Sequence, residues 1–164
     1  MMIQKLWKVK ITWDDPVPLH IRLSWLELRE LLPLLNKMKF DRCVITKDSR
    51  DIQIHGFCDA SETGYGACLY LQSTDNEGMH HSSFLCSKSR VAPVQTVSIP
   101  RLELCAALLL VRLYTSTRKA LQHLTISPYV FWSDSTVTLH WINSSPHSLK
   151  TFVSNCVVQI QEDT

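Results

Sequence analysis

Several features that often reveal what a protein does are absent from this sequence of 164 residues. Its cysteines form no Cys-x-x-Cys pair, which argues against a structural zinc site. The net charge at pH 7 is only +2, so no strong field marks a nucleic-acid-binding surface. The longest apolar run, residues 102–111, is about half the length needed to cross a bilayer and contains a glutamate. Function must therefore be sought in individual side chains.

The composition is that of a folded intracellular protein. With 45% hydrophobic and 20% charged residues, the chain is long enough to bury one proper core. No segment resembles a secretion signal, so the sequon at Asn143 is interpreted as a chance match. We expect cytoplasmic or nuclear localisation, no membrane association, and reduced thiols that pack as small hydrophobic groups at Cys43, Cys58, Cys68, Cys86, Cys105 and Cys156.

The clearest local pattern is at residues 52–59, where apolar and polar side chains roughly alternate as on a half-buried strand. This strand ends on an acid, Asp59, which is followed by the small residues Ala60 and Ser61. A carboxylate at a strand end lies where side chains from neighbouring elements converge. The alternative is a turn-starting aspartate that hydrogen-bonds its own backbone.

The rest of the chain after residue 50 predicts an antiparallel meander and then helices. Further strands are expected at residues 64–72 and 81–87, followed by a basic loop at 88–98. A helix should run from Ile99 to about Leu121, with proline in its first turn. A fourth strand within residues 128–135 ends on Asp134, and a short helix and a last helix, 149–161, follow.

Residues 1–50 have a different character and are interpreted as a connector. Prolines and three tryptophans predict irregular, tryptophan-anchored packing, with Trp7, Trp13 and Trp25 as the anchors. A helix should follow from about Leu23 to Lys39, with a kink at Pro33.

Glu103 is the only charged residue in the apolar segment 102–111, which must be covered by the sheet and by other helices. An unpaired, ionised glutamate there would cost several kcal/mol, so it needs a cationic partner or a metal ion. Neither Arg101 nor Arg112 has the i+3 or i+4 spacing that would place it alongside. The sequence therefore favours a functional role for Glu103.

Three acids thus lie at two strand ends and in the first turn of a helix: Asp59, Asp134 and Glu103. A helix packed across the sheet can bring Glu103 up to both strand ends. Carboxylate oxygens suit Mg²⁺ or Mn²⁺, and two such ions about 4 Å apart are a standard means of splitting phosphodiesters. For Asp134 the alternative is an N-cap of the following helix.

Four sequence runs resemble the ribonuclease H domain of the reverse-transcribing polyprotein of Bel/Pao-type LTR retrotransposons: GFCDASETGYGACLY, LCSKSRVAPVQTVSIPRLELCAALLLVRL, FWSDSTVTLHWI and SLKTFVSNCVVQIQ. The run LWKVKITWDDPVP and the helix after it resemble the connection segment before that domain. The resemblance implies a connection-like segment at 1–50 and a ribonuclease H-like domain at 51–164. It also implies an α/β fold with a mixed sheet, whose first three strands are antiparallel and whose fourth lies beside the first, flanked by helices on both faces.

By this resemblance Asp59, Glu103 and Asp134 are the first three ligands of a four-carboxylate site, with Asp59 bridging two Mg²⁺ or Mn²⁺ ions. The implied activity is endonucleolytic hydrolysis of the RNA strand of an RNA/DNA hybrid. The implied partners are that hybrid and the remainder of the polyprotein. Candidate nucleic-acid contacts, some of which could equally be ordinary surface residues, are Ser61, Lys88, Arg90, Ser135 and Lys150.

The sequence departs from the family after its last helix, where only residues 162–164 remain. We expect the last strand, the following helix and the fourth acid to be missing, which would weaken the metal site and leave the fourth strand at the sheet edge. Two alternatives stay open: a non-catalytic module that binds nucleic acid or protein, and a remnant of a decayed element without a function. No Tyr-x-Asp-Asp motif occurs, so the chain is not the polymerase.

Overall fold

The computed structural model describes residues 2–39, 43–45 and 49–164, and it forms two compact units, Met1–Phe40 and Asp41–Thr164. The first unit contains α1 (Met2–Val9), α2 (Leu19–Leu31) and the 3₁₀ helix η1 (Leu32–Lys37). The predicted interruption at Pro33 is present, because the α-helix ends at Leu31 and continues as a 3₁₀ turn. Throughout the described residues, no helix is both long and apolar enough to cross a membrane.

Two expectations for the first unit are wrong. Residues 2–9 form a helix, since Ile3, Leu6 and Trp7 have the i, i+3, i+4 spacing of an apolar helix face. The tryptophans do not anchor packing: Trp7 is 69% exposed and Trp13 is fully exposed. Among the described residues of this unit, Ile21 is the one buried hydrophobic side chain.

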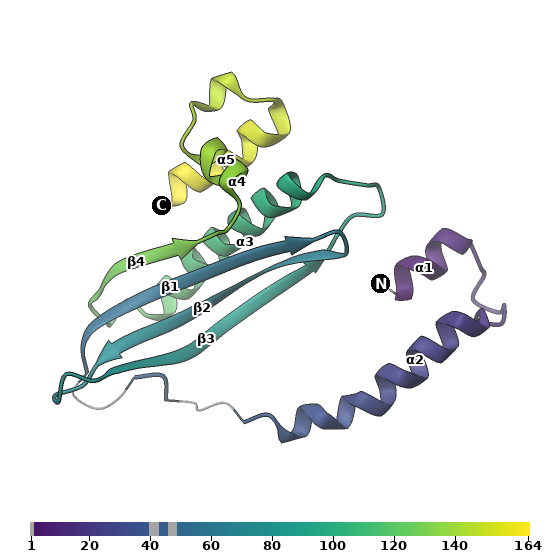
Figure 1. Ribbon diagram of the computed structural model, residues 1–164, viewed down its shortest axis with the longest axis horizontal. Helices are drawn as coiled ribbons and strands as arrows, with labels where there is room; N and C mark the ends of the chain where they lie inside the picture. Colours follow the sequence, from purple (N-terminus) through teal and green to yellow (C-terminus); the bar gives the residue numbers. More distant parts are fainter. Residues whose placement is uncertain (1, 40–42, 46–48) are drawn as a thin grey trace. The chain divides into compact units, whose positions relative to one another are not determined.

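The second unit is built on a four-stranded sheet (Figure 1). Its strands are β1 (Arg50–Ser61), β2 (Gly64–Thr74), β3 (His80–Val91) and β4 (Ile126–Trp132), in the spatial order β3-β2-β1-β4. The first three strands pair antiparallel, and β4 lies parallel to β1 at the sheet edge. This confirms the predicted α/β fold class, including the fourth strand beside the first.

The third strand is longer than the sequence suggested. It runs to Val91, and Lys88 and Arg90 pair with Ala67 and Tyr65 of β2 instead of starting a loop. Polar and basic residues are common on edge strands, where they discourage pairing with other chains. A charged strand end was therefore mistaken for a loop.

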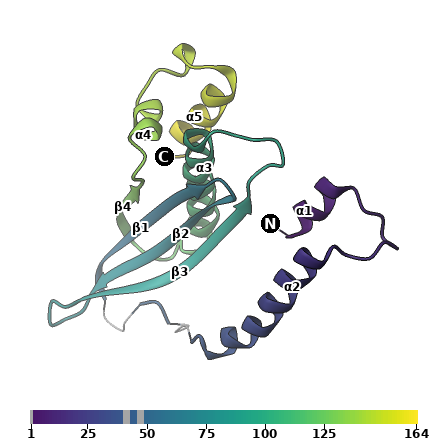
Figure 2. The same ribbon diagram turned by 45° about the vertical axis from the view of Figure 1, so that its right-hand side comes forward.

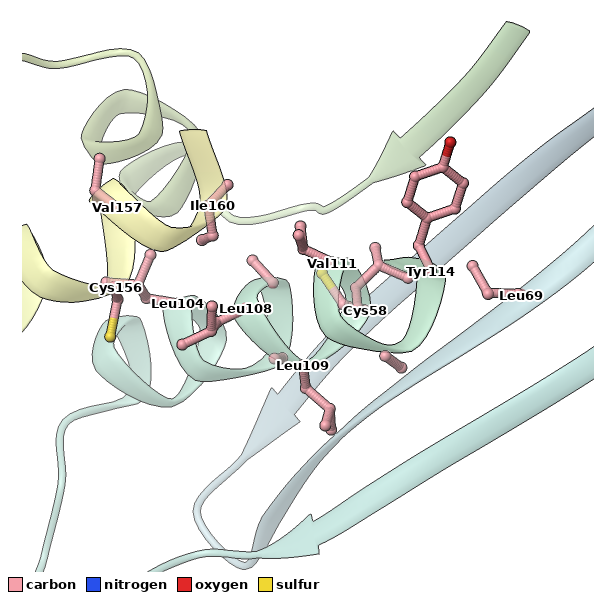
Figure 3. Packing of buried hydrophobic residues seen from close by; sticks show 14 of the residues in the cluster. Cys58, Leu69, Leu104, Leu108, Leu109, Val111, Tyr114, Cys156, Val157 and Ile160 are labelled. Carbon is pink, nitrogen blue, oxygen red and sulfur yellow. The ribbon is translucent and has the colours of Figure 1, made fainter. Parts of the chain in front are cut away.

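Three helices complete the unit: α3 (Ile99–Ala120), α4 (Thr136–Ile142) and α5 (Thr151–Asp163), with a 3₁₀ turn η2 (Pro146–Ser148) between the last two. Helix α3 lies along the sheet, and α4 and α5 lie near its first turns (Figure 2). Figure 3 shows Leu104 and Leu108 of α3 beside Cys156 of α5. As predicted, the long apolar helix is covered by the sheet on one side and by another helix on the other.

The two faces of the sheet differ. On the inner face, Ile54, Gly56 and Cys58 are buried under α3, while the outer face presents His55 and Phe57. Among the described residues of the second unit, helices pack on the inner face only, so the prediction of helices on both faces is not met there. The outer face instead carries an aromatic cluster that spans all four strands: His55, Phe57, Tyr70, Phe84 and Trp132.

Candidate active site

The register between the two parallel strands sets the position of two of the predicted acids. The last paired residues of β1 and β4 are Phe57 and Trp132. Asp59 lies two residues beyond Phe57, and Asp134 lies two residues beyond Trp132. Because the carboxyl ends of parallel strands meet at one edge, these acids occupy equivalent places on neighbouring strands. Asp59 is still within β1, opposite Gly66, whereas Asp134 belongs to the segment between β4 and α4.

The pKa of a nearby buried thiol, Cys58, is affected by both acids. Burial raises the pKa of Cys58 to about 11, and the negative charges of Asp134 and Asp59 push it in the same direction. The thiol donates to the backbone carbonyl of Trp132, with 3.6 Å between Sγ and O. Cys58 therefore links the ends of β1 and β4, and both carboxylates act on it.

Glu103 reaches the same region from α3. It is the fifth residue of that helix and is half-buried. Its Oε2 accepts a short hydrogen bond from the hydroxyl of Ser135, the residue directly after Asp134. Within the described ranges no cation lies at ion-pair distance from Glu103, as its spacing from Arg101 and Arg112 predicted, and the Ser135 hydroxyl is its hydrogen-bond donor.

The N-cap of α4 is Ser135, not Asp134. The Ser135 hydroxyl accepts from the backbone N–H of Thr138 at 3.2 Å, which is the usual capping bond to the third residue of a helix. The capping alternative for Asp134 is thereby removed, and its exposed carboxylate has no capping role. For Asp59 the local alternative is partly realised, because its Oδ1 accepts from the backbone N–H of Ala60 at 2.7 Å.

The donor set has the right chemistry for a hard divalent cation, since it consists of carboxylate oxygens. As the described side chains stand, no three His, Cys, Asp or Glu residues are gathered closely enough to hold a metal ion. Asp59 and Glu103 are each turned to a hydrogen-bond donor, Ala60 N–H and Ser135 O–H respectively.

The predicted nucleic-acid contacts lie in separate places. The Ser61 hydroxyl is used within its own turn, where it accepts from Thr63 N–H at 3.4 Å and lies 3.2 Å from the carbonyl oxygen of Gly64. Lys88 and Arg90 are exposed near the end of β3. Lys150 lies directly before α5.

Lys150 lines a groove of about 430 Å³ at the starts of two helices. Helix α5 begins there without a side-chain cap, so backbone N–H groups in its first turn remain available to a ligand. The start of α3 offers fewer donors, because Pro100 has no N–H and the amides of Arg101 and Leu102 donate to the carbonyl oxygen of Ser98. The groove is lined by Ser98, Pro100, Arg101, Val137, Trp141, Ser148, Leu149, Lys150 and Val153.

Arg101 is a basic residue of this groove that was not among the contacts predicted from the sequence. It lies in the first turn of α3, where the helix dipole disfavours a cation. Its guanidinium carbon lies 5.5 Å from the ring centre of Phe152, which holds it at the start of α5. A basic residue directly after the helix-opening Ser98-Ile99-Pro100 was the available signal, because such a placement costs energy unless an anion offsets it.

The chain was compared with known sequences and with solved structures. No curated protein matches the chain. Among solved structures, ribonuclease H1 from the halophilic archaeon Halobacterium salinarum NRC-1 is 9% identical, with a TM-score of 0.41 over 68% of this chain and 76% of that chain. The NurA nuclease from Sulfolobus solfataricus is 13% identical, with a TM-score of 0.36 over 87% of this chain and 52% of that chain.

The decisive match is to a sequence family. The family described as "Pao retrotransposon-like RNaseH-like domain" matches residues 1–135, which include β1 to β4 and all three predicted acids. This span is well over half of the chain. The protein therefore belongs to the family of Pao retrotransposon-like RNaseH-like domains.

Proposed function

We propose that this RNaseH-like domain hydrolyses the RNA strand of an RNA/DNA hybrid, with Asp59, Glu103 and Asp134 as the ligands of a divalent metal centre. The observation that carries the proposal is the equivalent placement of Asp59 and Asp134 on the parallel strands β1 and β4. Glu103 is joined to the same place through Ser135. The family assignment supports a nuclease of this type.

The ions proposed are Mg²⁺ or Mn²⁺, two in the complete site. When bound, such ions lower the pKa of a water molecule and stabilise the leaving oxygen of a phosphodiester. Asp59, which is exposed at the end of β1, is the ligand proposed to contact both ions. Its Oδ1 accepts from the Ala60 amide, which leaves Oδ2 for an ion.

The groove at the starts of α3 and α5 is the proposed phosphate contact. Lys150 and Arg101 supply positive charge, and the uncapped start of α5 supplies N–H donors. The groove and Glu103 share the first two turns of α3, so a phosphate held there lies near the candidate metal site. Phosphate contacts position a duplex, and discrimination of RNA from DNA needs contacts to the 2′-hydroxyl.

The biological setting proposed is a reverse-transcriptase polyprotein that acts inside the cell, as the retrotransposon family assignment suggests. The remainder of that polyprotein would be the domain's macromolecular partner, and the hybrid made during reverse transcription would be its substrate.

The alternative is a non-catalytic module that keeps the fold and binds nucleic acid or protein. Two observations favour it: Asp59 and Glu103 already have hydrogen-bond donors, and the described side chains form no three-ligand cluster. The groove at Lys150 would then be the functional surface.

Cleavage of an end-labelled RNA/DNA hybrid, in Mg²⁺ and separately in Mn²⁺, tests the two functions. The Asp59→Asn variant should lose more activity than the roughly 10–100-fold that loss of an outer-shell partner costs, because it removes a ligand. Glu62→Gln is the matched control, since it removes one exposed carboxylate from the adjacent turn. Single-stranded RNA and duplex DNA should remain uncut.

If the folded parent chain binds the hybrid without cutting it, the proposed nuclease activity is wrong and the non-catalytic binding module is supported. Equal cutting by the parent and Asp59→Asn would remove Asp59 from the site. In metal-free buffer Asp59→Asn should unfold no more easily than the parent, because the variant loses only an exposed bond while repulsion among the carboxylates is relieved.

A further inference from the structure

Ser135 connects two parts of the candidate site through one hydroxyl group. Its O–H donates to Oε2 of Glu103, which projects from α3. Its oxygen accepts from Thr138 N–H, which fixes the start of α4. Its own backbone N–H donates to the hydroxyl oxygen of Ser133 at 3.3 Å. The Ser135 hydroxyl therefore ties the residue directly after Asp134 to α3 and to the start of α4.

Ser135 is buried, so its hydroxyl keeps these two hydrogen-bond partners. The residue is 7% exposed, so water has little access to compete for the hydroxyl. A serine hydroxyl has one proton to donate, and here that proton goes to Glu103. This leaves it no proton for a nucleic-acid phosphate, the role that the sequence predicted for Ser135. The bond to a carboxylate is charge-assisted, which makes it stronger than the capping bond.

We propose that Ser135 is a positioning residue for Glu103: its hydroxyl fixes the Glu103 carboxylate relative to Asp134, so that both acids present a defined geometry to a metal ion. The inference rests on the proposed function. One Glu103 oxygen is occupied by the serine, and the other oxygen stays available. Outer partners of this kind orient ligating carboxylates in metal sites generally.

Capping and positioning can be separated because glycine replaces serine well at an N-cap, at a cost of only a few tenths of a kcal/mol, whereas alanine does not. Ser135→Gly therefore removes the donor to Glu103 and largely keeps α4. Ser135→Ala removes both roles, and Ser135→Thr keeps the hydroxyl. Ser133→Ala is the control from the same segment, because Ser133 bonds to Ser135 and not to Glu103 in the described hydrogen bonds.

The first test is binding of Mn²⁺ alone to the folded full chain, measured by calorimetry below the unfolding transition of every variant. Ser135→Gly and Ser135→Ala should both weaken Mn²⁺ binding by about tenfold or more. The Mn²⁺ affinities of Ser135→Thr and Ser133→Ala should stay within about threefold of the parent's affinity, which is a much smaller change than the loss expected for the other two variants. The same pattern is expected in the Mg²⁺ concentration that gives half-maximal hybrid cleavage.

The second test needs neither metal nor activity. A double-mutant cycle between Ser135→Ala and Glu103→Leu is measured by urea unfolding in chelator, since leucine cannot accept the serine proton. The two changes should be coupled by at least about twofold in the unfolding equilibrium constant. Ser133→Ala with Glu103→Leu should be additive.

The outcomes separate this inference from the proposed function. If Ser135→Ala weakens Mn²⁺ binding but Ser135→Gly does not, Ser135 acts only as the N-cap of α4 and does not position Glu103. A parent that neither cuts hybrid nor binds Mn²⁺ refutes the proposed function. In that case the double-mutant cycle still tests the contact between Ser135 and Glu103. Coupled effects of the two changes support the contact, and additive effects overturn it.

Discussion

The two faces of strand β1 differ in function, although their residues alternate along the same backbone. Ile54, Gly56 and Cys58 point to the inner face and are buried in the core beneath α3. His55 and Phe57 point to the outer face, whose line of side chains ends at the exposed Asp59. Alternation thus lets one strand anchor the fold on one side and present a carboxylate on the other. Stability and activity should respond to different halves of the strand.

Strand β4 repeats this division. Tyr129 and Phe131 contact Tyr114 of α3 on the inner side, with ring centres 4.8 and 5.1 Å from that of Tyr114. Trp132 lies on the outer side, 51% exposed, and its ring stacks with Phe57 at 6.4 Å. The inner contacts join the strand to the helix that carries Glu103, so core packing sets the distance between the candidate ligands.

The largest effect on stability is expected on the inner face, from Leu69→Ala. Leu69 is fully buried in β2 and belongs to the cluster under α3. Removing it should lower the free energy of unfolding by about 3 kcal/mol, through lost burial and a residual cavity. Urea denaturation followed by far-UV circular dichroism measures this. A loss below about 1 kcal/mol would mean that the inner face is loosely packed.

Gly56 and Gly66 offer a matched comparison of the faces. A Cβ on Gly56 would lie 2.7 Å from Leu110 Cδ1 and 2.8 Å from Phe131 Cδ1, so Gly56→Ala must displace both side chains. We expect a loss of about 1–3 kcal/mol from overpacking. A Cβ on Gly66 meets nothing closer than 3.5 Å, so Gly66→Ala should cost nothing or stabilise slightly. Equal effects in urea denaturation would contradict the difference between the faces.

Periodicity explains what could be predicted about the fold. The alternation in residues 52–59 and the continuous apolar run 102–111 each allow one arrangement, a half-buried strand and a helix covered on both sides. The end of β3 and helix α1 were missed for a shared reason. Charged residues on an edge strand and tryptophans on a short helix are compatible with several structures, and pairing or packing decides among them.

The places of the acids at the strand ends could be predicted from the sequence, but their contacts could not. Acids at strand ends identify themselves, because the strand pattern stops on a charge at Asp59 and at Asp134. The hydrogen bond from Ser135 to Glu103 joins residues 32 positions apart and depends on how α3 crosses the sheet, which no local pattern encodes. The groove at Arg101 and Lys150 likewise exists only because two helix starts meet.

A smaller effect is expected on the outer face, from Phe57→Ala. Phe57 is 42% exposed and contacts Trp132 and Tyr70 through ring interactions. Because much of the ring is already in water, the change should cost about 1 kcal/mol, the scale of aromatic pairing. Parallel urea denaturation of Phe57→Ala and Leu69→Ala checks the ranking. A larger loss for Phe57→Ala would show that the outer face is part of the core.

The smallest effect concerns pH, and it again belongs to the inner side of the molecule. Burial between α3 and α5 raises the pKa of the Cys156 thiol, and the nearby charge of Arg112 opposes this only in part. The folded state therefore resists losing this proton more than the unfolded state does. Its contribution to stability is complete below the thiol's unfolded pKa, about 8.5, and is lost as pH rises above that value.

Thermal unfolding of the parent and of Cys156→Ala between pH 7 and pH 10 measures this contribution as a difference, which removes the effects of thiols that do not interact with Cys156. Cys156→Ala should be less stable at pH 7, because it leaves a small cavity at the interface between α3 and α5. The gap between the two proteins should narrow above about pH 8.5, since only the parent must then bury an increasingly ionised thiol or break the contact. A constant gap across this range would mean that Cys156 titrates as it does in the unfolded chain, and that water reaches the inner side at α5.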